Sequence, residues 1–216
     1  MKPRITNQKN HAMTLTEVLV VIAVLAVLIA LILPALTLAP HRSHLNCVNN
    51  LKEIGLAYRV WAGDNGDKYP MEVSVTNVGT MELVADGKNA WLNYLVMSNI
   101  LNTPKLLICP ADKDHSFVTN FGTNFNNSHI SYFVGSDAGE QFPQALLSGD
   151  DNFEIGGVPV KSGLLEISSS SPPVSWSAAR HHFVGNIGMA DGSVQQVTQS
   201  GLLLQETGVT NRLAIP

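Results

Sequence analysis

The hydrophobic residues of the chain are concentrated in one uninterrupted run near its beginning. Every position from Val18 to Leu33 is apolar, and no residue between Val18 and Pro40 carries a charge. A helix needs about 20 apolar residues to cross the hydrocarbon core of a bilayer, and the 22 residues from Val18 to Ala39 reach that length. Secretory signal peptides contain a shorter apolar stretch of roughly 7–15 residues. The pattern therefore predicts a membrane-spanning helix over residues 13–39.

A second pattern follows this run and has helical spacing. Apolar residues recur there at intervals of four and three positions, as on one face of an amphipathic helix: Cys47, Leu51, Ile54, Tyr58 and Trp61. This stripe predicts a helix over residues 40–62 that packs on a globular part, residues 63–216. The helix either continues the membrane span or is a separate short helix, with a break near Pro40.

The globular part has weaker signals for both helices and strands. Helical spacing in Asn89–Leu101 predicts a second short helix, and three apolar runs predict strands: Lys105–Cys109, Ile130–Gly135 and Gln144–Asp150. Phe183–Ala190 and Ser193–Val197 predict a β-hairpin, because Asp191-Gly192 between them favours a tight turn whose twist matches paired strands. Gly185 and Gly188 within the first of these strands indicate a bulge or a close approach of the backbone.

The charge of the chain argues against nucleic acid as a partner. The formal charge is −4. If the chain is cut after Ala12, three of its 13 basic residues and none of its 17 acidic residues are removed, and the formal charge becomes −7. Binding to phosphates needs a basic surface. The three removed residues, Lys2, Arg4 and Lys9, precede the predicted span and predict a cytoplasmic N-terminus.

One acidic residue, Glu17, stands at the beginning of the apolar run. A carboxylate at a membrane-facing position is unfavourable and tends to mark a function with a partner charge. Cleavage between Ala12 and Met13 would create a terminal amine four residues before Glu17. In an assembly of staggered helices, the amine of one subunit can meet the carboxylate of its neighbour, and such a pair stabilises only when both charges are present.

The segment AMTLTEVLVVIAVLAVLIALILPAL, residues 12–36, resembles the leader and helix of type IV pilins and type II secretion pseudopilins. Thr14, Leu15, Glu17 and the late Pro34, which would loosen the helix, match the usual pattern. Ala12 stands where that family usually has Gly, and Met13 where it usually has Phe. The resemblance implies a pilin-like α+β fold, in which a long N-terminal helix packs on a small antiparallel sheet.

The same resemblance implies how such a chain is made and used. Residues 1–12 would be a leader removed by prepilin peptidase, after which the Met13 amine is methylated. The mature subunit would then assemble in membrane lipid with other pilin or pseudopilin subunits, at an inner-membrane assembly platform. Its C-terminal domain would lie in the periplasm or outside the cell, and the chain itself would catalyse nothing. A type II secretion-like pseudopilin is favoured over a type IV pilus subunit; a membrane-anchored binding domain that never polymerises is the structural alternative.

Two further blocks resemble pseudopilin-like proteins of planctomycete and verrucomicrobial type. One is the stretch from Cys47 to Ala57 together with the later Cys109-Pro110, and the other is His181, nine intervening residues, and Asp191-Gly192. A tethered hydrolase using His181 and Asp191 is the enzymatic alternative. It is disfavoured because no nucleophile motif such as Gly-x-Ser-x-Gly lies near them. In the structural interpretation without catalysis, Asp191 forms a turn, and His181 is a strand-end side chain bonded to backbone.

Candidate ligands and cysteines leave alternatives open. Cys47 and Cys109 either form one disulfide, if this part lies outside the cytoplasm, or are two buried thiols. No cofactor is expected, except that Asp150, Asp151 and Asn152 could hold calcium with help from Asp191; otherwise they form a solvated acidic turn. His181-His182 without a third ligand is weak support for zinc.

Overall fold

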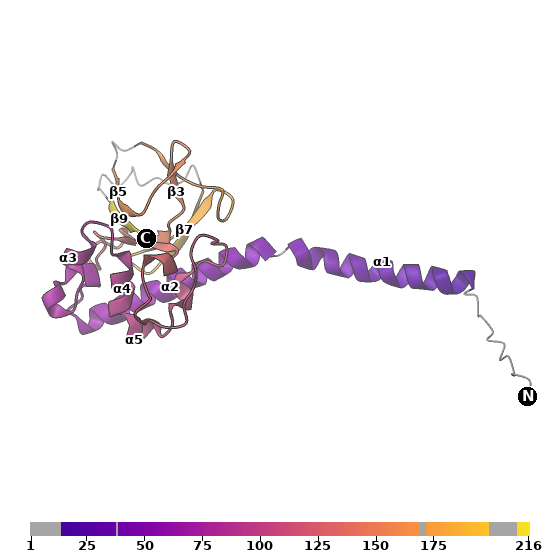
Figure 1. The fold of residues 1–216 in the computed structure, drawn as a ribbon, viewed down its shortest axis with the longest axis horizontal. Coiled ribbons are helices and arrows are strands. Elements are labelled where there is room, and N and C mark those ends of the chain that lie inside the picture. The colour runs from indigo at the N-terminus through magenta and orange to yellow at the C-terminus, as the bar shows by residue number, and fades with distance from the viewer. Residues whose placement is uncertain (1–13, 38, 169–171, 199–210) are drawn as a thin grey trace, which may run out of the picture. The chain divides into compact units, whose positions relative to one another are not determined.

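The computed structural model describes residues 14–37, 39–168, 172–198 and 211–216, and it describes no side chain of residues 33–43. The chain divides into two units, Met1–Ala39 and Pro40–Pro216. Figure 1 shows the chain as a ribbon and labels the α-helices and some of the strands. The predicted leader, residues 1–12, and the processing residue Met13 lie outside the described residues.

The first unit contains one apolar helix. Helix α1 spans Leu15–Thr37 and continues through Pro34. Its 18-residue segment Leu15–Ile32 has a mean hydropathy of 3.0, so the helix is long and apolar enough to cross a membrane. The side chains of this segment are exposed, as expected for a surface that packs against lipid or against other helices.

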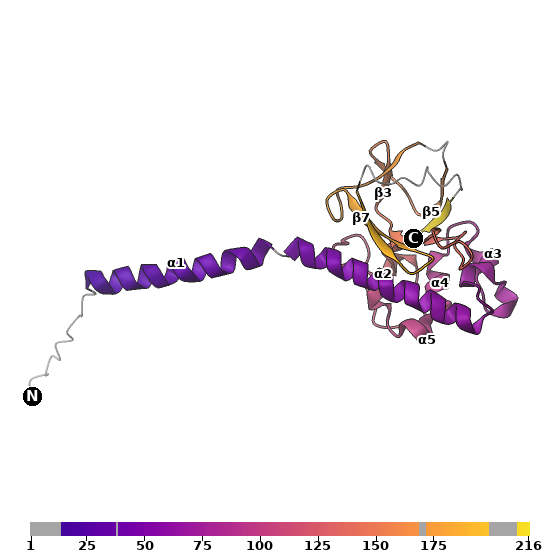
Figure 2. The ribbon, with the colours of Figure 1, turned by 180° about the vertical axis from the view of Figure 1, so that it is seen from behind.

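Helix α2 spans Ala39–Asp64, and all of it except Ala39 belongs to the second unit. Residue 38, between α1 and α2, lies outside the described residues, so the choice between a continuous helix and a break near Pro40 falls outside them as well. The predicted stripe is buried, with every member at most 6% exposed: Cys47, Leu51, Ile54, Tyr58 and Trp61. Figure 2 shows α2 lying along the globular part. The predicted amphipathic helix is confirmed, because burial of this one face fixes α2 on the domain.

Short helices join α2 to the first strand. The α-helices are α3, Met81–Val84, α4, Ala90–Val96, and α5, Ser98–Leu101, and the 3₁₀ helices are Pro70–Glu72, Val75–Asn77, Pro104–Leu107 and Asn127–His129. The helix predicted over Asn89–Leu101 is thus present as α4 and α5. The prediction of a strand over Lys105–Cys109 is wrong. Pro104 begins a 3₁₀ turn there, and the side chain of Thr103 accepts a hydrogen bond from the Lys105 N–H at its start.

In the described part of the chain, all strands pair in antiparallel fashion, in two sheets. The six-stranded sheet has the order β5-β9-β1-β2-β7-β8, and the three-stranded sheet has the order β4-β3-β6. The bounds of the first five strands are β1 Tyr132–Gly135, β2 Leu146–Asp150, β3 Phe153–Ile155, β4 Val158–Pro159 and β5 Gly163–Ile167. The others are β6 Val174–Trp176, β7 Val184–Met189, β8 Val194–Thr198 and β9 Asn211–Ile215. The α+β class with a helix packed on antiparallel strands is confirmed.

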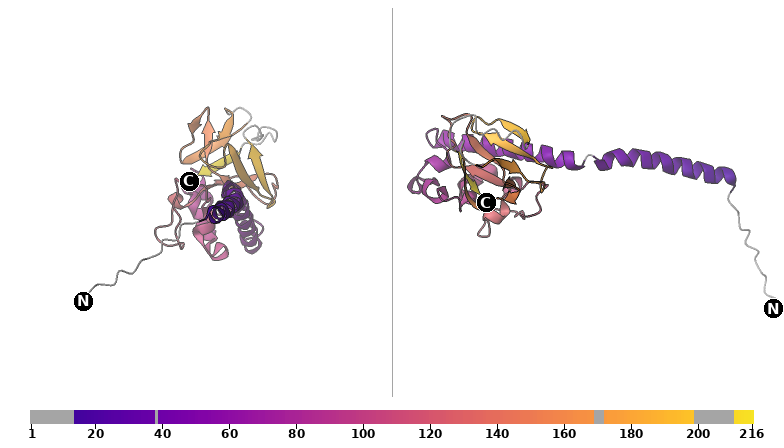
Figure 3. Two further views of the ribbon diagram at one scale, coloured as in Figure 1. Left: turned by 90° about the vertical axis from the view of Figure 1, so that its right-hand side faces the viewer. Right: turned by 90° about the horizontal axis from the view of Figure 1, so that it is seen from above.

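The large sheet has an apolar core on each of its two faces. Alternate residues of a strand point to opposite faces, and in β1 Tyr132 and Val134 join the core shared with α2 and α4. Phe133 between them joins the second core, with Phe153 and Trp176 of the small sheet. Figure 3 shows the helices on one side of the large sheet and the small sheet on the other. The domain therefore has three layers.

The predicted hairpin is confirmed, but its turn is longer than the Asp-Gly pair. Strands β7 and β8 pair up to Gly188 and Val194. The Gly192 N–H then donates to the Met189 carbonyl at 3.0 Å. Within the turn Gly192 has a φ of 84°, which glycine adopts without a Cβ penalty. The expected close approach occurs at Gly185, where a Cβ would lie 2.4 Å from the ring of Trp176.

Candidate functional site

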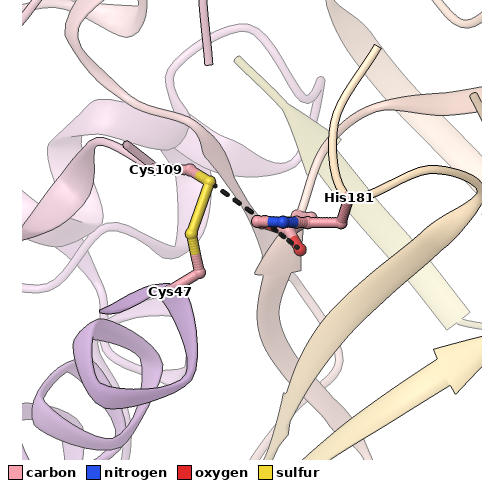
Figure 4. A group of neighbouring side chains, drawn as sticks. Cys47, Cys109 and His181 are labelled. Atoms are coloured by element: carbon pink, nitrogen blue, oxygen red, sulfur yellow. Dashed lines mark hydrogen bonds and ion pairs between the residues drawn. A yellow bond between two sulfur atoms is a disulfide. The ribbon is translucent and has the colours of Figure 1, made fainter. Parts of the chain in front are cut away.

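The two cysteines lie together beside the histidine of the C-terminal signature. Cys47 of α2 and Cys109 after the third 3₁₀ helix form a disulfide, and both residues are fully buried. His181 Nε2 lies 3.2 Å from the Cys109 sulfur and 3.8 Å from Oδ2 of Asp150 at the end of β2. Figure 4 shows the Cys109 and His181 side chains pointing toward each other. Of the two alternatives for the cysteines, the structure has the disulfide.

Arg180, next to His181, forms the centre of a buried ion-pair network. Its Nη2 lies 2.5 Å from Asp112 Oδ2 and its Nη1 lies 2.5 Å from Asp151 Oδ1, while its side chain is only 3% exposed. Nη1 also donates to the Ser131 carbonyl at 2.9 Å. His115 Nδ1 lies 2.8 Å from Asp112 Oδ2. The network joins the Cys109–Asp112 segment, the end of β2 and the segment before β7.

The pKa values of the acidic groups in and beside this network shift in opposite directions. Burial raises the pKa of Asp112, but the hydrogen bond with His115 and the charge of Arg180 outweigh it, so the pKa lies well below its usual value. The hydrogen bond with Asp112 raises the pKa of His115. Burial raises the pKa of Asp150 and that of Asp151 to about 6. Asp112 is therefore held as the ionised partner of Arg180.

Asp150 has its own hydrogen bonds and one atom without any. The backbone N–H and the side-chain amide of Asn186, on β7, both donate to Asp150 Oδ2 at 2.8 Å. Oδ1 of this fully buried carboxylate has no hydrogen-bond partner among the described residues. A buried acceptor left unsatisfied costs about 1–3 kcal/mol, so this atom marks a place where a further group would be favourable.

The backbone that carries His181 is strained. His181, His182 and Phe183 have φ values of 44°, 52° and 65° in succession. Each non-glycine residue held in this left-handed region costs of order 1–3 kcal/mol, and such residues cluster at functional sites. Burial of the imidazole of His181 and its contacts fix this turn. Burial and the nearby charge of Arg180 lower the pKa of His181, which favours the neutral imidazole.

The Asp191-Gly192 end of the signature lies in the hairpin turn and docks on α2. Arg59 Nη1 donates to the Asp191 carbonyl at 3.1 Å. A Cβ on Gly55 of α2 would lie 3.7 Å from Gly192 Cα. Asp191 Oδ1 accepts from the Ser193 N–H at 2.8 Å, so the prediction of Asp191 as a turn former is confirmed.

The first helix begins with a reciprocal cap. Thr14 N donates to Glu17 Oε2 at 2.7 Å, and Glu17 N donates to Thr14 Oγ1 at 3.3 Å. This is a capping box, in which Thr and Glu three residues apart satisfy each other's backbone N–H groups. Sequence reasoning missed this role of Glu17, although the Thr-x-x-Glu spacing is its signal. Glu17 therefore has a function within the single subunit as well as the one expected between subunits.

Residues 7–33 match the family model described as the prokaryotic N-terminal methylation motif. The N-terminal segment of the chain is type IV pilin-like. The matched residues include the processing positions Ala12 and Met13, the capping pair and most of α1. The motif implies processing by prepilin peptidase and assembly with other pilin subunits, and the apolar helix fits a membrane anchor. No curated protein sequence and no solved structure matches the chain.

The fold does not bring His181 and Asp191 together as a pair. His181 contacts Cys109 and Asp150 and does not act as a strand-end side chain bonded to backbone. Asp191 lies in an exposed turn and bonds Ser193. The hydrolase alternative therefore has no support from the positions of these two side chains.

The four residues predicted to bind calcium lie in different surroundings. Asp150 accepts from Asn186, and Asp151 pairs with Arg180. Asn152 donates to the Ser177 carbonyl, and Asp191 is in the hairpin turn. In the described part of the chain, Asp150 groups instead with the two cysteines and His181. The side chains that meet here include Arg180 and Asp112, which no motif singled out beforehand.

Proposed function

We propose that this pilin-like protein is a pseudopilin of a type II secretion-like system and catalyses no reaction. It is cut after Ala12, methylated on Met13, and assembled through α1 at an inner-membrane platform, with its C-terminal domain in the periplasm. The observation that carries the proposal is an acidic residue at the head of an exposed apolar helix inside a methylation motif. The Ala12 and Met13 departures from the usual Gly and Phe leave the cleavage point to be tested directly.

The assembly step rests on the charge of Glu17. In the single subunit, Thr14 donates two hydrogen bonds to the Glu17 carboxylate, from its N–H and its hydroxyl group. When α1 packs among other helices in lipid, this charge enters a medium of low dielectric constant, and it needs an opposite charge. The free amine of Met13 on a neighbouring subunit supplies that charge. The amine–carboxylate pair then sets the register of one subunit against the next.

Two substitutions separate this pairing from the capping role. Glu17→Gln keeps the length and the acceptor oxygen that a capping box needs but removes the charge. Thr14→Val is the matched control, because it removes the side-chain cap and keeps the charge. Both full-length variants are expressed with the assembly proteins, and cysteine crosslinking between α1 helices measures the polymer.

We expect Glu17→Gln to lose at least tenfold of the crosslinked polymer at an unchanged level of membrane-inserted protein, and Thr14→Val to keep most of it. If Glu17→Gln assembles like the wild type, the pairing is refuted. If only Thr14→Val fails, Glu17 acts as a cap alone. Absence of crosslinks in the wild type would favour the anchored domain that never polymerises.

N-terminal sequencing of the mature protein tests the processing step. A methylated Met13 as the first residue is the expected result. A start beyond residue 36 would mean that the helix is discarded, and an intact Met1 would mean that no processing occurs; either result contradicts the proposal. Deleting the gene then separates the two kinds of filament: loss of protein secretion with intact surface pili supports a pseudopilin, and the reverse result indicates a type IV pilus subunit.

Calcium binding stays a prediction. Comparing the thermal unfolding temperature in calcium and in a chelator tests it, and an unchanged temperature would remove calcium from the account.

A further inference from the structure

A group of metal-ligating side chains lies in the second unit of the chain. Cys47, Cys109, Asp150 and His181 each offer one ligand atom, and these atoms all lie within 4.8 Å of one another. The residues come from α2, the segment after the third 3₁₀ helix, the end of β2 and the turn before β7. Their side chains are buried, with those of His181 and Asp150 at most 1% exposed.

We propose that the chain with its two cysteines reduced binds one Zn²⁺ ion through these four side chains. Two thiolates, an imidazole nitrogen and a carboxylate oxygen are the ligand types that zinc takes, and four ligands complete a closed tetrahedral site. Each cysteine sulfur has either the metal or the other sulfur as its partner. The zinc-bound chain and the disulfide-bonded chain therefore exclude each other.

The backbone positions suit both states. In a tetrahedral site with Zn–S bonds of about 2.3 Å, the two sulfurs lie about 3.8 Å apart. The Cα atoms of Cys47 and Cys109 are 5.4 Å apart, so rotation of the two side chains provides that separation. His181 already directs Nε2 toward this point, at 3.2 Å from the Cys109 sulfur. Burial of the imidazole, whose side chain is 1% exposed, keeps it there although the backbone is strained.

Asp150 gives the second, independent observation. Its Oδ1 is buried and has no hydrogen-bond partner among the described residues. Oδ2 is held by two hydrogen bonds from Asn186, as outer groups hold the carboxylate ligand of a metal. Oδ2 is also the oxygen shown beside His181, 3.8 Å from its Nε2, so a cation bound by this carboxylate would lie next to Oδ2. It would also offset a local excess of acidic groups, because Arg180 already shares its one charge between Asp112 and Asp151.

Cobalt and zinc titration of the full-length protein in detergent tests the site. The protein is reduced with a phosphine, freed of it by desalting under anaerobic conditions, and titrated with Co²⁺, whose tetrahedral thiolate complexes absorb strongly. We expect one Co²⁺ per chain, thiolate-to-cobalt charge-transfer bands, and displacement by one equivalent of Zn²⁺. The disulfide-bonded protein should show none of these signals.

Three variants assign the ligands. Cys47→Ser should abolish the full charge-transfer band, and His181→Ala should weaken zinc binding at least tenfold. His182→Ala is the matched control, since His182 is the exposed neighbour with the same backbone strain, and it should bind like the wild type. Equal binding by all variants, or binding by the disulfide form, would overturn the proposal.

The test also works if the protein unfolds once it is reduced and free of metal. Near-ultraviolet circular dichroism reports whether the aromatic core is packed. If the reduced protein has lost this signal, Zn²⁺ should restore it in the wild type and in His182→Ala, but not in His181→Ala. Failure of zinc to restore it in the wild type would refute the site.

Discussion

Replacing Arg180 by Leu tests whether the buried ion-pair network stabilises the domain. Arg180 contacts Asp112 and Asp151 at 2.5 Å each and donates to the Ser131 carbonyl, with only 3% of its side chain exposed. Arg180→Leu would leave the buried Asp151 carboxylate without its cation and Asp112 with His115 alone. Breaking a buried pair by removing one partner typically destabilises a protein by about 3–5 kcal/mol. We expect the loss in free energy of unfolding to fall in that range.

Urea denaturation of the full-length protein in detergent measures the loss. The fluorescence of the three tryptophans reports on the second unit alone, because none of them lies in α1. With a slope of about 2 kcal/mol per molar urea, the midpoint should fall by about 1.5–2.5 M. Arg212→Leu is the matched control. Arg212 pairs with Asp137, but its side chain is 45% exposed, so its loss should cost at most about 1 kcal/mol.

The decisive comparison is between the urea midpoints of the two arginine variants and of a triple variant in which the acidic partners of Arg180 are also neutralised. If Arg180→Leu shifts the midpoint no more than Arg212→Leu does, burial of the network contributes nothing and the reasoning is refuted. Adding Asp112→Asn and Asp151→Asn to Arg180→Leu should recover part of the loss, because the stranded charges are then removed. A further large loss in the triple variant would mean that the carboxylates have other essential partners.

Two other predictions follow from the core and from the charges. In Gly185→Ala the new Cβ would lie 2.4 Å from the Trp176 ring, so overpacking should lower the free energy of unfolding by about 1–3 kcal/mol. Gly63→Ala is the control: a Cβ there has nothing within 4 Å, so the melting temperature should stay unchanged or rise. Equal melting temperatures for the two variants would contradict the overpacking at Gly185. Asp112→Asn should destabilise the protein at pH 7. Because the pKa of Asp112 in the fold lies below its unfolded value of about 3.9, the stability it provides is present above that value and is lost as pH falls through the folded pKa. The gap to the wild type should therefore narrow below about pH 4, and a gap independent of pH would exclude this cause.

Local sequence patterns were enough to predict those helices whose signal lies within one continuous segment. The apolar run from Val18 is continuous and needs no partner in the chain to be recognised. The stripe from Cys47 to Trp61 repeats with the helical period, and all its members are buried. The strand predicted over Lys105–Cys109 failed because a proline and a cap favoured a 3₁₀ turn over the apolar composition.

The sequence by itself determined the apolar helix, the N-terminal methylation motif and the hairpin, because each depends on residues within a few turns of one another. Only the tertiary structure decided the partners of Cys47, Cys109, Arg180 and His181. Cys47 and Cys109 are 62 positions apart, and Arg180 meets Asp112 and Asp151 from different segments. Strand order and the packing of α2 bring these side chains together, and neither leaves a periodic trace in the chain. The side-chain contacts at the centre of the domain therefore arise from the fold, whereas the apolar helix arises from composition.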